Sequence, residues 1–201
     1  FVFRREAPLG TPLDGPLPAS KLFSRRFGHR VRGPFVHTPA GWAVRPSVLP
    51  PNFAGAALAL FRNDELVGAI TDPQEKDGAV VVVAPGSAPE PSLDDVYRVA
   101  AAKVRVLSGP FVRQRGHMWA ISVPDLRGLA DDANGQKFKS SVHIFEDGRQ
   151  LMHPHSLHDD IARIGKGRFS HWGEAVYFAA SDNTDPNRNG RVYSLVYHIV
   201  E

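Results

Sequence analysis

The chain has 201 residues, of which 42% are hydrophobic and 22% charged, and its formal net charge is +3. A chain of this length can bury its own core, and the absence of Cys excludes disulfides, thiol catalysis and thiolate metal sites. No apolar run approaches about 18 residues, so we expect no membrane span, and the missing cysteines favour the cytoplasm. Because the chain begins with Phe1 rather than Met, a natural N-terminus carrying a targeting signal can lie outside it.

The first quarter of the chain is basic and rich in Pro and Gly. Residues 1–50 hold eight Arg and Lys against Glu6 and Asp14, a net charge of +6, so the remainder carries −3. We interpret residues 1–52 as an arm or extended N-terminal segment, and residues 53–201 as a β-rich globular domain. The arm can meet nucleic acid or an acidic partner, or it can lie solvated on the domain. No RNA-binding motif accompanies it, so nucleic acid is not an expected partner.

The next residues predict mainly strands. Residues 56–70 have the pattern of a β-hairpin, with Asn63 and Asp64 supplying the turn. The β-branched run at 79–84 indicates a strand buried on both faces. Ser92 before two aspartates predicts a helix start. In the stretch that follows, alanines favour a helix and later valines favour a strand, and residues 117–123 predict another strand.

The C-terminal third contains a second hairpin, a short helix and two further strands. Asp147 and Gly148 predict the turn of a hairpin over residues 141–152. A helix is expected over residues 156–165, with Ser156 as its cap and Gly165 as its stop. Its expected apolar stripe is Leu157, Ile161 and Ile164.

Strands at 174–180 and 191–200 flank a polar loop. Several short strands with few helices predict a mainly β fold: an antiparallel β-sandwich or jelly-roll-like fold with one or two short helices.

The most unusual segments are residues 168–173 and the loop 181–191, which is dense in Asp and Asn. Such side chains donate and accept hydrogen bonds as sugar hydroxyls require, an Arg binds carboxylate or phosphate, and a Trp or Tyr face suits the C–H side of a sugar ring. The candidate ligand-binding residues are Arg168, His171, Trp172, Asp182, Asn183, Asp185, Asn187, Asn189 and Arg191.

The same loop has two other readings. Asp182, Asp185, Asn187 and Asn189 offer oxygens to Ca²⁺, although their spacing departs from the EF-hand pattern. Alternatively, these residues only build a long hairpin turn by bonding their own backbone. We therefore expect no obligatory cofactor, with calcium as the one candidate.

Three histidines close in sequence form a second constellation. His153, His155 and His158 match no zinc signature, so no metal site is assigned to them. No nucleotide-binding or standard hydrolase motif occurs in the sequence, and the catalytic residues of any enzyme activity are unknown. An enzymatic reading would use an acid–base pair drawn from these residues: His155, His158 or His171 with Asp159, Asp160 or Asp182.

Residues 141–193 carry a resemblance. The segments concerned are residues 145–148, 155–161, 167–173, 177–178 and 181–193. Together they resemble a segment of bacterial proteins of surface-polysaccharide assembly, where it accompanies glycosyltransferase or methyltransferase domains. The resemblance implies a setting in bacterial glycan metabolism and carries over no catalytic residue.

These observations lead to a principal hypothesis and two alternatives. The principal one is a non-catalytic carbohydrate-binding or accessory module whose partners are a glycan or glycoconjugate and, in addition, a catalytic domain or identical subunits. The first alternative is a sugar-active enzyme with a His/Asp pair. The second is a structural or assembly domain that grips a partner through its basic arm.

Overall fold

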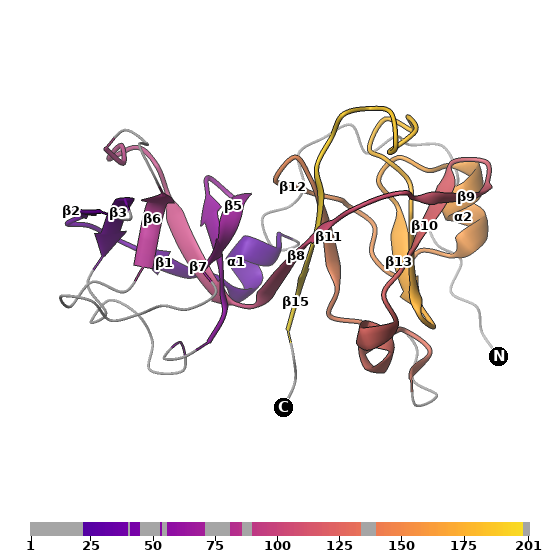
Figure 1. Ribbon diagram of the computed structural model, residues 1–201, viewed down its shortest axis with the longest axis horizontal. Helices are drawn as coiled ribbons and strands as arrows, with labels where there is room; N and C mark the ends of the chain where they lie inside the picture. The colour runs from indigo at the N-terminus through magenta and orange to yellow at the C-terminus, as the bar shows by residue number, and fades with distance from the viewer. Residues whose placement is uncertain are drawn as a thin grey trace.

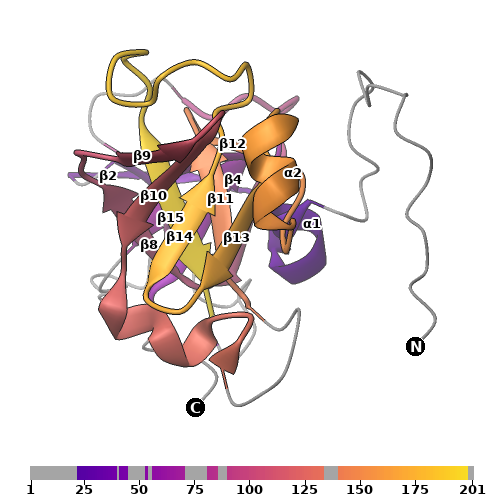
Figure 2. The ribbon, with the colours of Figure 1, turned by 90° about the vertical axis from the view of Figure 1, so that its right-hand side faces the viewer.

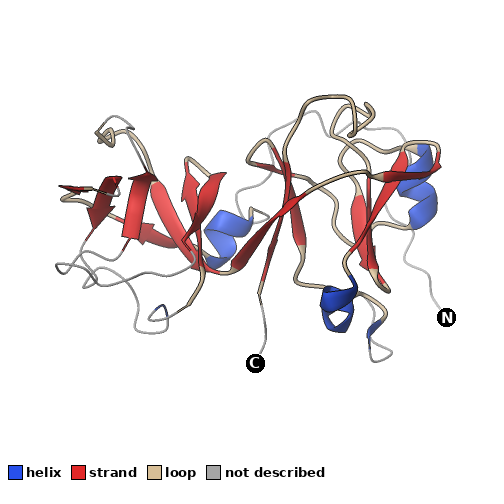
Figure 3. Ribbon diagram, in the orientation of Figure 1, coloured by secondary structure: helices blue, strands red, loops and turns tan. Residues whose placement is uncertain are grey.

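The computed structural model describes residues 22–39, 41–44, 53, 56–70, 81–85, 90–133 and 140–198. Within them the fold is mainly antiparallel β, with a few short helices (Figure 3). The strands form two lobes that lie side by side, with helix α1 (Phe23–Phe27) between them (Figure 1). We call β1 to β7 the N-terminal lobe and β8 to β15 the C-terminal lobe. The expected mainly β fold is confirmed.

The N-terminal lobe contains two sheets that share one core. The first has the order β1 (His29–Val31), β7 (Tyr97–Ala101), β4 (Leu58–Arg62), β5 (Glu65–Ile70). The second consists of β2 (Val36–Thr38), β3 (Gly41–Val44) and β6 (Val81–Pro85). Val44 of one sheet and Leu58 and Val99 of the other belong to the same buried cluster.

The described part of the expected arm contributes strands to both of these sheets. β1 pairs with β7, and β3 pairs with β6, so residues on either side of the expected boundary share a ladder. The boundary itself near Asn52, residues 1–21 and the expected burial of the strand at 79–84 lie outside what the structure describes. The division at residue 52 stays a prediction.

The C-terminal lobe is a β-sandwich. One sheet has the order β12 (Arg149–Gln150), β11 (His143–Glu146), β15 (Tyr193–Tyr197), β8 (Lys103–Leu107). The other has the order β13 (Phe169–Trp172), β14 (Ala175–Phe178), β10 (Met118–Ser122), β9 (Val112–Arg115). Leu195 of the first sheet and Trp119 and Phe178 of the second lie in one buried cluster between them.

Two helical segments flank this sandwich (Figure 2). The 3-10 helix η4 (Pro124–Leu129) follows β10, and α2 (His158–Arg163) packs on the outer face of the second sheet. Ile161 and Ala162 of α2 contact Met118 and Ala179 there. In the part of the chain that the structure describes, no helix is long and apolar enough to cross a membrane.

The turns predicted from sequence are confirmed. β4 and β5 join through Asn63 and Asp64, whose φ values of 51° and 70° are those of a tight hairpin turn. β11 and β12 join in the same way through Asp147 and Gly148, with φ values of 47° and 80°. Asn, Asp and Gly tolerate this left-handed conformation better than other residues do.

Three local predictions are wrong. Residues after Ser92 form strand β7 rather than a helix, and the Ser92 hydroxyl accepts the Asp94 N–H in a turn, whereas β8 is the strand that the later valines favoured. Ser156 does not cap α2, because its hydroxyl donates to the His153 carbonyl and Leu157 occupies the N-cap position. Leu157 is also 66% exposed instead of joining the apolar stripe. Gly165, with φ of 67°, does end the helix as expected.

Candidate functional site

The loop of residues 181–191, which we call the Asp/Asn loop, is held on the C-terminal lobe by a buried carboxylate. Glu146 of β11, 5% exposed, accepts hydrogen bonds from the Ser181 N–H (2.8 Å) and hydroxyl (3.0 Å) and forms an ion pair with Arg191. Arg191 also bonds Asp182 at 2.6 Å. The hydrogen bond from Thr184 and this guanidinium hold the pKa of Asp182 well below its usual range. Both ends of the loop are therefore tied to one strand.

The asparagines of the loop also form hydrogen bonds to the rest of the lobe. Asn187 accepts the Phe111 N–H (2.7 Å) and donates to the Phe111 carbonyl (2.9 Å). Asn183 accepts the Lys166 N–H at 2.6 Å and donates to the Ile164 carbonyl. Asn189 donates to the Tyr193 hydroxyl at 2.8 Å.

Asp185 completes this set by accepting the Asn187 N–H at 2.9 Å. Every Asp and Asn candidate of the loop is thus engaged within the protein, as expected for a turn held by its own side chains. Among the described residues, no group of three or more His, Asp and Glu is placed to hold a metal ion.

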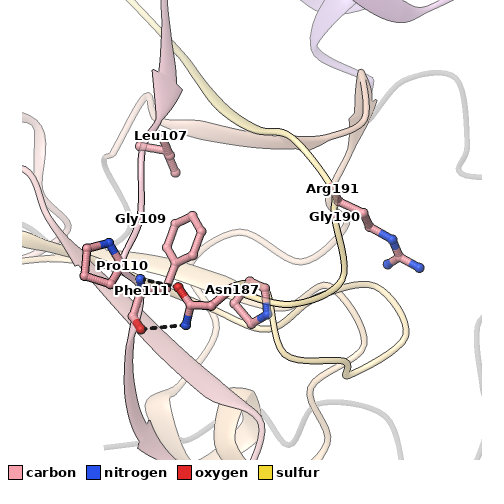
Figure 4. A pocket seen from close by; sticks show the side chains of 8 residues that line it. Leu107, Gly109, Pro110, Phe111, Asn187, Gly190 and Arg191 are labelled. Atoms are coloured by element: carbon pink, nitrogen blue, oxygen red, sulfur yellow. Dashed lines mark hydrogen bonds between the residues drawn. The ribbon is translucent and has the colours of Figure 1, made fainter.

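A hollow of about 590 Å³ lies where the loop meets the β8–β9 connection (Figure 4). Leu107, Phe111 and Asn187 line it together with Pro110 and neighbouring residues. The Arg191 side chain points away from it in Figure 4, toward its acidic partners. The polar groups at this hollow are thus occupied by bonds that hold the loop.

Trp172 lies at the other end of the β13–β14 hairpin. It pairs with Ala175 beside the turn, whereas the Asp/Asn loop follows β14 beyond Phe178. A four-residue strand spans roughly 10 Å. Figure 2 shows the loop at the top of the lobe and the hairpin turn at the bottom. The structure therefore does not bring Trp172 and the loop together.

Trp172 instead lies beside two other aromatic side chains. By strand register, Trp172 and Tyr177 share the outer face of the sheet. The His158 ring of α2 contacts both, at 4.3 Å from Tyr177 and 6.3 Å from Trp172 between ring centroids. We call Trp172, Tyr177 and His158 the platform. Trp172 is 44% exposed, so its ring is open to a ligand.

The edge of the platform is polar. Arg115 of β9 forms an exposed ion pair with Asp159, the residue after His158. Burial, together with the charge of Arg115, lowers the pKa of His158, so its imidazole is uncharged at neutral pH. The result is an uncharged aromatic surface with a charged, hydrogen-bonding pair beside His158.

His171 lies on the opposite, inner face of the same strand and is 1% exposed. Its Nδ1 lies 3.0 Å from the Ser140 hydroxyl. Burial lowers its pKa and outweighs the opposing charges of Asp131 and Asp132. Ligand contact at His171 would therefore require opening of the core.

His155 belongs to the same buried region. Its Nδ1 is 2.8 Å from Asp131, which also accepts the Ser140 N–H at 2.9 Å. Burial opposes ionisation of Asp131, but these bonds outweigh it and its pKa is lowered. Asp131 and Ser140 carried no recognisable sequence signal, because their partners are distant in the chain.

The histidine constellation is separated in space. His153 bridges Arg168 through the backbone, His155 contacts Asp131, and His158 joins the platform. Arg168 itself donates to the Gly165 carbonyl at 3.1 Å. The histidines expected as acid or base thus contact residues other than those with which the sequence paired them.

Comparison of the chain with models of known families, with characterised proteins and with solved structures finds no match.

Proposed function

We propose that this chain is a carbohydrate-binding module whose ligand stacks on the platform formed by Trp172, Tyr177 and His158. The observation that carries the proposal is the 44% exposure of Trp172, on a face where its neighbours are also aromatic. A sugar ring presents an apolar C–H face to such a surface and directs its hydroxyls outward. The Arg115–Asp159 pair lies where those hydroxyls can be met.

The resemblance of residues 141–193 to polysaccharide-assembly proteins supports the same ligand class, because all three platform residues lie inside it. The proposal places the module beside an enzyme of bacterial glycan metabolism. It also moves the site away from the loop at 181–191, whose side chains are engaged with the protein. The contact between the Ser140 hydroxyl and His171 is buried, so it gives no support to an enzymatic function.

Replacing Trp172 with Ala is expected to weaken oligosaccharide binding at least about 10-fold, the scale of one aromatic stacking contact. Calorimetric titration against a panel of bacterial oligosaccharides measures the affinity, and Trp172→Phe should retain part of it. The matched control is Arg188→Ala, because Arg188 is 87% exposed in the loop and remote from the platform.

Normal binding by Trp172→Ala would mean that the ligand does not stack on the platform, and loss of binding in Arg188→Ala alone would place the ligand on the loop. If no oligosaccharide of the panel binds the unmodified protein, the carbohydrate assignment is wrong.

A further inference from the structure

Helix α1 packs between the two lobes, which also contact each other directly through Leu66 and Gly148; we call the contact between α1 and the C-terminal lobe the joint. Its Phe23 side chain is 1% exposed and contacts Phe61 of the N-terminal lobe and Phe145 of the C-terminal lobe. On one side, Ser24 and Arg25 bond Asp64 of the β4–β5 turn, at 2.9 and 2.8 Å. On the other side, α1 meets two histidines of the C-terminal lobe.

These histidines hold Phe23 between them. The ring of His143 lies 5.1 Å from the Phe23 ring, edge to face, and the ring of His198 stacks on it at 5.2 Å. Phe27 adds a second contact to His198 at 4.5 Å. The contact between α1 and the C-terminal lobe therefore includes two groups that titrate, beside the apolar side chains of Phe145 and Val196.

Two hydrogen bonds, which we call the relay, link Phe23 to His143 through Gln150 and require His143 to be neutral. The Phe23 N–H lies 2.6 Å from Gln150 Oε1, and Gln150 Nε2 lies 3.3 Å from His143 Nδ1. A backbone N–H can only donate, so the amide must present its oxygen to Phe23 and its NH₂ group to His143. His143 Nδ1 must then accept, which requires an imidazole without a proton on Nδ1.

We propose that protonation of His143 releases α1 from the C-terminal lobe, which makes the joint sensitive to pH. A proton on Nδ1 faces the NH₂ group of Gln150. If the amide turns to accept it, the NH₂ group then faces the Phe23 N–H. Either arrangement breaks one of the two bonds of the relay.

The surroundings of His143 also favour its neutral form. Burial, with the charges of His155, His198 and Arg26, lowers the pKa of His143 to about 4. Arg26 faces it from α1, His198 from the end of β15, and His155 from the turn before α2, while Gln150 on β12 is uncharged. Burial also lowers the pKa of His198. No acidic group is among the charges that act on His143 in the described residues, so nothing there favours its imidazolium.

The stability of the joint therefore depends on pH in one direction and over a defined pH range. The closed joint holds neutral His143, so its stability is full above about pH 6.5, the pKa of an exposed His. It falls as the pH decreases from there toward about 4. Between pH 7 and pH 5, the equilibrium for opening should increase about 20-fold.

Amide hydrogen exchange of the whole chain tests the pH dependence of the joint. The measured rates are divided by the intrinsic exchange rate at each pH to give the protection of each amide. Protection of residues 23–28 should fall about 20-fold between pH 7 and pH 5 and should stay below that of β10 and β14 at both pH values, because α1 is released without unfolding of the C-terminal lobe. The variant His143→Asn keeps an acceptor for Gln150 but cannot titrate, so its α1 protection should change much less with pH than that of the unmodified protein, with His198 as the remaining titrating contact. His117→Asn, at the β9–β10 turn, is the matched control and should behave like the unmodified protein.

A second variant keeps the test decisive if His143→Asn does not fold. In Gln150→Glu, a carboxylate can accept from both Phe23 and protonated His143, so α1 protection should be no lower at pH 5 than at pH 7. Constant α1 protection in the unmodified protein overturns the proposal. So does an equal loss in His143→Asn, or α1 protection as high as that of β10 and β14, because α1 would then open only when the whole lobe unfolds.

Discussion

Replacing Arg191 with Ala is expected to lower the free energy of unfolding by about 2 to 3 kcal/mol. The side chain of Glu146 is 6% exposed, and without Arg191 its charge keeps only the two hydrogen bonds from Ser181. Removing one partner of a buried ion pair costs about 3 to 5 kcal/mol. Arg191 is 28% exposed and its second partner Asp182 42%, and this partial exposure reduces the expected effect to slightly below that range.

Arg188→Ala is the matched control, because it removes an Arg from the same loop. Arg188 is 87% exposed and lies 3.8 Å from Asp185, so its loss should change stability by less than about 0.5 kcal/mol. Denaturant unfolding of both variants, followed by the fluorescence of buried Trp119, measures the difference. If the two variants lose equal stability, the Glu146 network does not hold the loop.

The sequence predicted those elements whose cause is local. The two hairpins were predictable because Asn63, Asp64, Asp147 and Gly148 set the turn geometry by their own chemistry. The strand β7 was not, because Ser92 and the alanines favour a helix locally. β7 is held between β1 and β4. Such long-range pairing overrides local propensity.

The candidate site could be predicted only in part, for the same reason. The density of Asp and Asn identified an unusual loop, but composition cannot show that Asn187 is already bonded to Phe111. The sequence predicted that Trp172 and the Asp/Asn loop bind one ligand together. In the structure they lie at opposite ends of the β13–β14 hairpin. The contact of His158 with Trp172 and Tyr177 depends on where α2 packs, which no local pattern specifies.

The packing of α2 in turn depends on Gly116. This residue forms the β9–β10 turn with φ of 53°, and a Cβ there would overlap the carbonyl oxygen of Ala162 in α2. The same oxygen accepts the His117 N–H at 2.9 Å. Gly116→Ala should therefore lower the free energy of unfolding by about 2 to 4 kcal/mol, from the positive φ and from the overlap together.

Gly190→Ala separates these two causes. Gly190 has a φ of 72°, but a Cβ there would meet nothing within 4 Å, so only the conformational cost of about 1 kcal/mol is expected. Denaturant unfolding of both variants gives the cost of the overlap by difference. Because the displaced helix carries His158, Gly116→Ala should also weaken oligosaccharide binding although Trp172 is intact, whereas Gly190→Ala should not. Equal effects of the two substitutions would mean that the turn does not position α2, and that the platform is assembled by the sheet alone.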